Sequence, residues 1–289
     1  MPQITRARSL LASLAPVSPA TSFPMPEEPS WSASPEDAGS TRRRLPVGPF
    51  LVDDLDAREA VEAAVELAVG ATDRPVRAYA LHVGGLNAHK DAAFVAEMRD
   101  AELVYADGGS VVLLGRLAGS RRLQRAPTTD IGWAVLRGVS ERLGRPARIA
   151  LIGGPPGLAA RAGQTLVDEG AGVVVFETDG YVEDWTPVLE GLASTDVDVC
   201  IVGLGAPREM LWVQTWLAQL PPSLILTCGG WFGFLAGDEK RARGVLRLPG
   251  VEWIARVAQS PRRLGGRYVR GIWVTLRLAA GLAVHRIRA

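Results

Sequence analysis

From residue 50 onward, short apolar segments alternate with longer segments whose apolar residues follow helical spacing. The short segments are typical of buried β-strands, and most of them end in glycine or threonine: 50–54, 77–85, 102–108, 147–154, 172–178, 198–205 and 223–230. The helical patterns cover 56–70, 87–101, 110–119 and 129–144, and further helical segments separate the last four strands. Asn87 is the expected N-cap of the helix over 87–101. This alternation predicts an α/β fold with a mostly parallel sheet and helices on both faces.

The pattern divides the chain into three parts. Residues 1–46 are rich in Pro, Ser and Ala and are predicted to be disordered. Arg6 and Arg8 precede a short apolar stretch, but no convincing cleavage site follows, so an export signal is disfavoured. Residues 42–44 are three arginines, which we expect to form a solvated run before the fold. The α/β core is predicted over 47–248, and a basic amphipathic appendage over 249–289.

The C-terminal segment differs sharply in charge from the rest of the chain. From residue 256 onward there are eight arginines and no acidic residue: Arg256, Arg262, Arg263, Arg267, Arg270, Arg277, Arg286 and Arg288. That leaves 24 of the 32 basic residues and all 31 acidic residues to the first 255 positions. A basic tail on an acidic body suggests an anionic partner.

Two interpretations of the helix-compatible stretch 261–285 remain open. It can be an amphipathic helix that dips into a bilayer interface, or a terminal helix packed on the sheet with its arginines facing water. The charge asymmetry favours membrane contact. No run of about 20 apolar residues is free of charge, so a transmembrane helix is not expected.

Cysteine usage and the glycines at the strand ends limit the function classes. Cys200 and Cys228 stand inside apolar runs and are predicted to be buried thiols of a reducing compartment. Glycine ends three strands of the expected Rossmann-like sheet, in the pairs Gly153–Gly154, Gly203–Gly205 and Gly229–Gly230. Ligands of such sheets bind at this edge. An intact GxGxxG after the first strand and a GxxxxGK[ST] loop are both missing, which disfavours a dinucleotide dehydrogenase and a P-loop NTPase.

Asp107 is the carboxylate that stands where a strand is predicted to end. In that position, before two glycines, it can act as a general base, although N-capping of the next helix is the commoner role of such an aspartate. The DxD pairs at 54–56 and 196–198 are expected at a helix start and at the amino end of a strand, which disfavours a metal site. His82, His89 and His285 lack metal-ligand spacing and are assigned no role.

Eight short motifs follow one another in a recognisable order: ELVYADGGSVV, RAPTTDI, ALIGGPPG, VGLGAPREMLW, CGGWFGFLAG, KRAR, GVEWIAR and SPRRLGGRY. In this order they resemble the WecG/TagA/CpsF family of glycosyltransferases, from about residue 50 to residue 268. The resemblance implies inverting transfer of an N-acetylhexosamine, such as N-acetylmannosamine, from a UDP-sugar to a polyprenyl-diphosphate-linked acceptor. It also implies metal-independent chemistry without a cofactor, at the cytoplasmic face of the membrane, in exopolysaccharide, capsule or wall-polymer synthesis.

The resemblance also implies roles for individual residues. Asp107 becomes the base that deprotonates the acceptor hydroxyl, with Asn87 close to it. The residues implied at the donor site are Gly108, Arg125, Asp130, Gly153, Gly154, Gly205, Pro207, Glu209, Gly229 and Gly230. Glu252 and Trp253 match a Glu-Trp pair of the family. The tail arginines Arg256, Arg263 and Arg267 would neutralise the acceptor diphosphate, for which guanidinium groups are well suited.

The sequence departs from the family pattern at five positions. Gly85, Glu209, Met210, Gly233 and Arg243 stand where the family has threonine, glutamine, an acid, aspartate and proline. Two explanations follow, an enzyme with altered sugar specificity or a catalytically degenerate subunit that binds a nucleotide sugar or lipid diphosphate. The retained Asp107 and tail arginines favour the enzyme. A nucleic-acid binder is disfavoured, because the tail lacks a stacking platform. Oligomerisation stays open, with the helices near Leu114 and Trp133 as one candidate interface.

Overall fold

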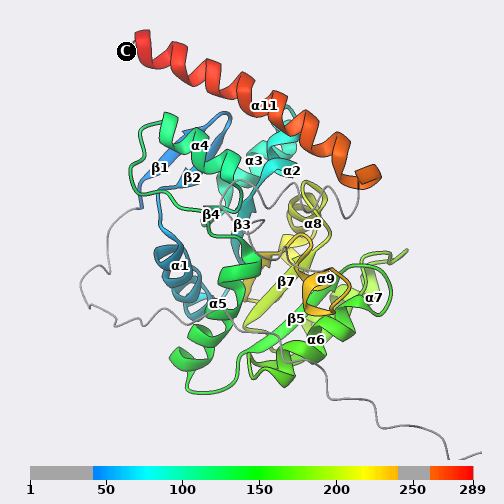
Figure 1. Ribbon diagram of the computed structural model, residues 1–289. Coiled ribbons are helices and arrows are strands. Elements are labelled where there is room, and N and C mark those ends of the chain that lie inside the picture. The colour runs from blue at the N-terminus through cyan, green and yellow to red at the C-terminus, as the bar shows by residue number, and fades with distance from the viewer. Residues whose placement is uncertain (1–41, 240–260, 289) are drawn as a thin grey trace, which may run out of the picture. The chain divides into compact units, whose positions relative to one another are not determined.

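The computed structural model describes residues 42–239 and 261–288 of the chain (Figure 1). Six strands form one sheet in the order β4-β3-β8-β7-β5-β6, and every neighbouring pair is parallel. The strands are β3 (Val76–Leu81), β4 (Leu103–Ala106), β5 (Arg148–Gly153), β6 (Val173–Thr178), β7 (Val199–Gly203) and β8 (Leu224–Thr227). A separate antiparallel pair joins β1 (Arg44–Val47) to β2 (Phe50–Asp53). The prediction of a mostly parallel, Rossmann-like α/β sheet is confirmed.

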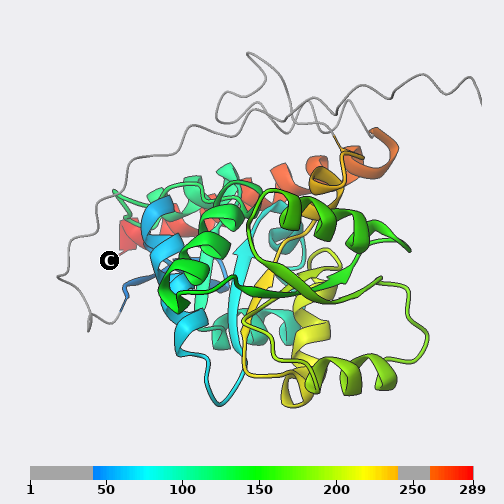
Figure 2. The same cartoon turned by 90° about the horizontal axis from the view of Figure 1, so that it is seen from below.

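Helices cover both faces of this sheet (Figure 2). The helices are α1 (Ala57–Gly70), α2 (Val83–Asn87), α3 (Ala92–Asp100), α4 (Gly109–Leu117), α5 (Thr128–Leu143), α6 (Leu158–Asp168), α7 (Thr186–Ala193), α8 (Arg208–Trp216), the 3₁₀ turn η1 (Leu217–Gln219), α9 (Trp231–Leu235) and α11 (Pro261–Arg288). Helices α1, α5, α6 and α9 share one hydrophobic core with the sheet. Helices α2, α3, α4, α7, α8 and α11, together with β1 and β2, build the core of the other face.

Most strands of the sheet form because their sequences are apolar on both sides of the pleat, whereas the edge strand β6 has no buried residue. Every residue of β4, β7 and β8 is buried, as expected for parallel strands with helices above and below. Local signals set the helix ends, since Asp56 and Glu59 make a reciprocal capping box on α1 and Gly144 ends α5 in the left-handed conformation. The thiols of Cys200 and Cys228 are free and buried, as predicted.

Three local predictions are wrong. The expected strand over 77–85 ends at Leu81, because the side chain of His82 accepts a hydrogen bond from the Gly84 amide and starts α2. Asn87 ends α2 instead of capping the next helix, whose N-cap is Asp91. The arginines at 42–44 are not a solvated run, since Arg44 opens β1 and its guanidinium donates to the Ala101 carbonyl at 2.5 Å. Each difference comes from a side-chain contact that the apolar pattern does not encode.

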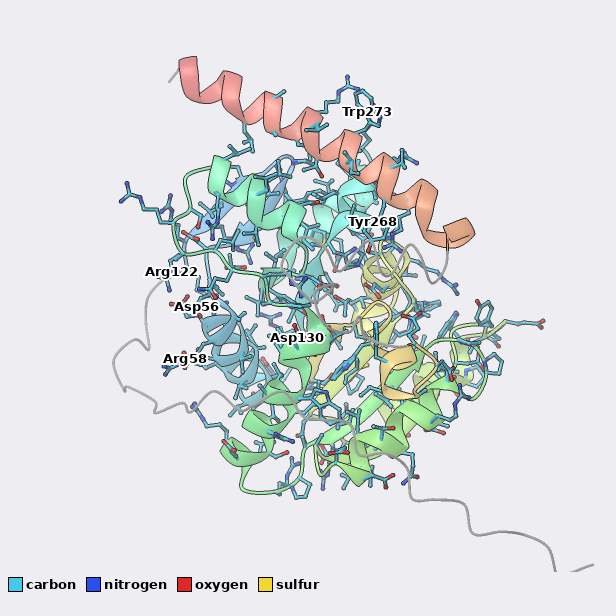
Figure 3. The ribbon with its side chains drawn as sticks, in the orientation of Figure 1. Asp56, Arg58, Arg122, Asp130, Tyr268 and Trp273 are labelled. Atoms are coloured by element: carbon cyan, nitrogen blue, oxygen red, sulfur yellow. The ribbon has the colours of Figure 1, made fainter. Side chains whose placement is uncertain are left out.

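Helix α11 docks along α2 and α4 (Figure 1). Val274, Leu278 and Leu282 pack into the core below it, while Tyr268 lies on the side of α11 that faces the body (Figure 3). The helix therefore packs mainly on α2 and α4, and Leu278 also lies against the turn between β1 and β2. Among the residues described, no helix has the length and apolar character needed to cross a bilayer.

Leu114 is fully buried in the core, so it cannot itself form the subunit interface proposed near it. The predictions for residues 1–41 and for the appendage before residue 261 lie outside the described residues.

Candidate active site

The carboxyl ends of all six parallel strands lie at one edge of the sheet. The register pairs Leu81 with Ala106, Val202 with Thr227, and Gly153 with Gly203. The residues that follow each strand are therefore neighbours across this edge. His82, Asp107, Cys228, Leu204 and Gly154 occupy these positions, and the strand-end glycines predicted from sequence lie among them.

Asp107 stands directly after β4. Its amide donates to the Leu81 carbonyl at 3.0 Å, which fixes the backbone of Asp107 beside the end of β3. Gly108, and not Asp107, is the N-cap of α4, so the alternative capping role for Asp107 is wrong. The structure thus presents this carboxylate at the ligand-binding edge of the sheet.

Glu209 is a fully buried carboxyl on the first turn of α8. Its Oε2 accepts the amide of Gly205 at 2.9 Å and the amide of Gly229 at 3.3 Å, so it ties the loop after β7 to the loop after β8. Oε1 has no hydrogen-bond partner. Burial raises the pKa of Glu209 to about 7, the two amides and Arg267 act to lower it, and Asp107 acts to raise it further.

Arg267 comes from α11 and reaches the same edge. Its guanidinium lies against Gly84 so closely that a Cβ at position 84 would overlap it. Its positive charge acts on the buried Glu209 carboxyl, on which Asp107 also acts. Asp107, Glu209 and Arg267 therefore form one electrostatic cluster, which we call the candidate catalytic cluster. Tyr105 and Cys228 adjoin this cluster, and burial raises the pKa of both well above its ordinary value.

Arg125 and Asp130 lie beside this cluster, in the segment that leads into α5. The amide of Ala126 donates to the Ala106 carbonyl at 2.7 Å, which brings the segment to the end of β4. The Arg125 guanidinium stands 3.8 Å from the Asp130 carboxylate, and Figure 3 shows Asp130 near the start of α5. Thr128 anchors the segment, because its hydroxyl donates to the Thr227 carbonyl at 3.1 Å.

The glycines after β5 and β7 stand where the winding of the sheet reverses, because the chain leaves β5 toward β6 and leaves β7 toward β8. Sheets of this kind bind nucleotides in a crevice at such a switch point, so we expect the nucleotide crevice beside these glycines. Gly153 has φ +135°, and a side chain there would overlap the Gly203 carbonyl. The amide of Gly154 donates to the Gly203 carbonyl at 3.2 Å. These glycines thus let the backbones at the ends of β5 and β7 approach each other closely. The amides of Gly154, Gly205 and Gly229 already donate hydrogen bonds to other groups of the protein.

Sequence reasoning missed His82. Its side chain caps α2. Its Cα and Cβ lie near the position that a side chain on Gly108 would take, and its Nε2 lies near the position that a side chain on Gly229 would take. His82 is therefore between Asp107 and the loop after β8. The apolar pattern did not indicate this position, because the predicted strand ran through His82 to residue 85.

Asn87 joins the α2 end of this site to α11. Its Nδ2 donates to the Arg267 carbonyl at 2.9 Å, while its buried Oδ1 has no partner. Asn87 therefore holds the turn of α11 from which the Arg267 side chain extends. Pro207 stands at the start of α8, between the crevice and α11.

The structure accounts for three departures from the family pattern. A side chain at Gly85 would meet Leu81 and Phe94, Met210 is buried in the core, and Gly233 lies against the Glu239 side chain. Arg243, Arg256, Glu252 and Trp253 lie outside the described residues, and the side chain of Arg263 does as well. Within the described ranges no three His, Cys, Asp or Glu side chains come together as metal ligands.

Glu209 should make stability depend on pH. Its folded pKa of about 7 exceeds its ordinary value of 4.5, so the folded state binds this proton more tightly and loses stability as pH rises from about 4.5 through 7. The substitution Glu209→Gln removes this titratable carboxyl, because a glutamine side chain takes up no proton in this pH range. We expect the fall in Tm between pH 5 and pH 8 to shrink by a few degrees in this variant. Calorimetry at both pH values measures the difference, and an equal fall in both proteins would contradict it.

A family model described as the glycosyl transferase WecG/TagA/CpsF family matches residues 46–288. The match includes every strand of the sheet, the candidate catalytic cluster and α11. The chain therefore belongs to the WecG/TagA/CpsF family of glycosyltransferases.

Proposed function

We propose that this glycosyltransferase moves an N-acetylhexosamine from a UDP-sugar to a polyprenyl-diphosphate-linked acceptor, with inversion and with Asp107 as general base. One observation carries the proposal. Asp107 stands at the carboxyl edge of the sheet in one electrostatic cluster with Arg267, beside the glycine crevice at which such sheets bind nucleotides. A base, a nucleotide crevice and a cation for phosphate are the groups that this reaction needs.

In this mechanism the acceptor hydroxyl attacks the anomeric carbon while its proton passes to the Asp107 carboxylate. The bond from the anomeric carbon to the diphosphate of UDP breaks on the opposite face, which inverts the configuration. Negative charge grows on the leaving diphosphate. The N-terminal ends of α6 and α8 follow β5 and β7 at the expected crevice and favour that charge, and Arg125 is proposed to assist them.

The two carboxyl groups of the candidate catalytic cluster have different roles in this proposal. Glu209 is fully buried and bonded to two loop amides, so it holds the loops after β7 and β8. We assign Asp107 the proton transfer, because Glu209 has no exposed oxygen to reach a substrate. Arg267 neutralises the acceptor diphosphate, and Arg256 and Arg263 are proposed to assist it.

Direct transfer tests the proposal. The full chain is incubated with a panel of UDP-N-acetylhexosamines and a polyprenyl-diphosphate-linked sugar, and both UDP release and the extended glycolipid are measured. The proposal predicts glycolipid formation from at least one donor, in amounts equal to the UDP released. Donor binding without glycolipid formation across the panel would favour the degenerate binding subunit.

We also propose that the part of the chain over 249–289 is an acceptor and membrane module, working at the cytoplasmic face. Helix α11 carries an exposed apolar stripe of Val269, Ile272, Trp273 and Leu276, at spacings of three and four residues. Trp273 is 72% exposed and points away from the body (Figure 3). Arg270 and Arg277 flank this stripe, which is the arrangement of a helix that lies in a bilayer interface.

Replacing Val269 and Ile272 by serine should weaken vesicle binding by about tenfold or more, because each loses apolar area that the interface would bury. Sedimentation with anionic phospholipid vesicles measures it. Val167→Ser, at an exposed valine on α6, is the matched control and should bind as the wild type does. Unchanged binding of the double variant would refute the membrane contact of α11.

A further inference from the structure

The Glu209 carboxyl lies directly beneath two glycine loops at the carboxyl edge of the sheet. Its Oε2 accepts the Gly205 amide of the loop after β7 at 2.9 Å and the Gly229 amide of the loop after β8 at 3.3 Å. The loop after β7 borders the expected nucleotide crevice. Because Glu209 is 0% exposed, it can influence a nucleotide only through these loops and through its charge.

The ionised form of this carboxyl is incompletely satisfied. Both amides donate to Oε2, whereas Oε1 receives no hydrogen bond from any residue that the structure describes. A buried carboxylate with one unpaired oxygen is costly, and protonation of Oε1 removes the charge while Oε2 keeps both amides. Burial raises the pKa of Glu209 to about 7, so the charge of this carboxyl changes at neutral pH.

The titratable and charged groups around Glu209 come from β4, from the loops after β3, β4 and β8, and from α11: Tyr105, His82, Asp107, Cys228 and Arg267. Arg267 favours the charged form of Glu209, and Asp107 opposes it. Burial raises the pKa of Tyr105 and of Cys228 well above the ordinary values, so both are neutral at pH 7. Added negative charge at this edge therefore shifts Glu209 toward its neutral form.

Glu209 also shares a helix end with the charge that a nucleotide would bring. It stands in the first turn of α8, and the N-terminal end of a helix carries a partial positive charge that stabilises an anion. An ionised Glu209 already uses this end of α8. A diphosphate in the expected crevice would place further negative charge at the same end, and like charges disfavour each other's ionised form. A neutral Glu209 leaves the helix end to the diphosphate.

We propose that Glu209 makes nucleotide binding depend on pH, because the crevice binds a nucleoside diphosphate with Glu209 protonated and releases it as Glu209 ionises. At and above neutral pH, binding of the diphosphate therefore draws one proton from solvent onto Oε1. Glu209 is a positioning residue in this scheme, since it holds the two loops and does not touch the nucleotide. The inference rests on the proposed function, from which it takes the nucleotide crevice. It also gives a physical consequence to the departure from glutamine at this position.

The affinity of the full chain for UDP, measured by calorimetry at pH 7 and at pH 8, tests this dependence. With a pKa of about 7, the protonated fraction of Glu209 falls from about one half to about one tenth, so the wild type should bind UDP about fivefold more weakly at pH 8. The charge of UDP changes little over this range, because a terminal phosphate titrates at about pH 6. Glu209→Gln keeps an oxygen for the two amides and should bind UDP equally at both pH values.

Titrations at pH 8 in two buffers with different ionisation enthalpies count the protons that are taken up with UDP. We expect the wild type to take up nearly one proton per UDP bound, and Glu209→Gln to take up almost none. Glu141→Gln, at an exposed glutamate near the end of α5, is the matched control and should take up as many protons as the wild type does. His82 is intact in all three proteins, so a proton bound by His82 would also appear in Glu209→Gln.

Equal proton uptake by the wild type and Glu209→Gln would overturn the inference. So would a wild type that binds UDP without taking up a proton, and this result decides the question even if Glu209→Gln does not fold. If UDP does not bind at all, the inference and the nucleotide crevice both fail.

The outcome also separates this inference from the proposed function. UDP binding with the expected proton uptake, but without sugar transfer to any acceptor, leaves the inference standing and refutes the transferase. Sugar transfer by a wild type whose affinity for UDP is the same at pH 7 and pH 8 refutes the inference alone.

Discussion

Replacing Asp107 by asparagine is expected to lower kcat for sugar transfer by about 10²–10⁴-fold, the usual contribution of a positioned general base. Asparagine is nearly isosteric but cannot accept the hydroxyl proton. The backbone of Asp107 is held by its amide bond to Leu81, which the substitution leaves intact. We therefore expect UDP binding and Tm to stay close to those of the wild type. Initial rates of glycolipid formation at saturating donor and acceptor measure the effect.

Asp73→Asn is the matched control, since Asp73 is exposed and precedes β3 at the opposite edge of the sheet. It should transfer sugar at the rate of the wild type. Full activity of Asp107→Asn would show that Asp107 is not the general base. If the wild type binds UDP-sugar and lipid diphosphate without transfer, and Asp107→Asn binds them equally, the chain is a binding subunit.

Replacing Arg267 by alanine should produce the second largest effect, a loss of about 10²–10³-fold in kcat/KM for the lipid-linked acceptor. The charge of Arg267 acts on the buried Glu209 carboxyl, on which Asp107 also acts. Its loss removes a partner of the acceptor diphosphate and also raises the pKa of Glu209 further. Arg267→Lys keeps the charge but loses the planar fork, so we expect partial recovery.

The same assay should be run with Arg142→Ala, an exposed arginine in the last turn of α5, which should behave as the wild type. Steady-state kinetics over a range of acceptor concentrations separate KM from kcat. Because Arg267 is assigned to the acceptor, KM for the donor should change little. A rise in donor KM with unchanged acceptor KM would instead place Arg267 at the UDP site.

The fold was predictable because its signals are local. Apolar runs such as 198–205 and 223–230 can be buried only inside a sheet covered on both faces, and the helical segments between them require parallel crossovers. The errors fall where a single side chain overrides the pattern. His82 ends a strand by capping α2, and Asp91 rather than Asn87 starts α3.

The site was predictable only in part. Parallel strands bring their carboxyl ends to one edge, so the residues after each strand were expected to meet, and Asp107 was found this way. Glu209 was expected to contact the donor, yet it is buried and bridges two loops. Asn87 was expected beside the base, and the structure adds a partner that the sequence did not indicate, the Arg267 carbonyl 180 positions away. Spacing along the chain does not reveal such partners.

The sequence by itself determined the α/β alternation, the glycines at the strand ends, the position of Asp107 and the basic tail. These features depend on residue type and short-range periodicity, which are read directly from the chain. Only the tertiary structure decided that Arg267 joins Asp107 and Glu209, and that α11 buries one apolar face while it exposes another. The physical reason is that these contacts form when distant segments pack, and burial of the Glu209 carboxyl then raises its pKa.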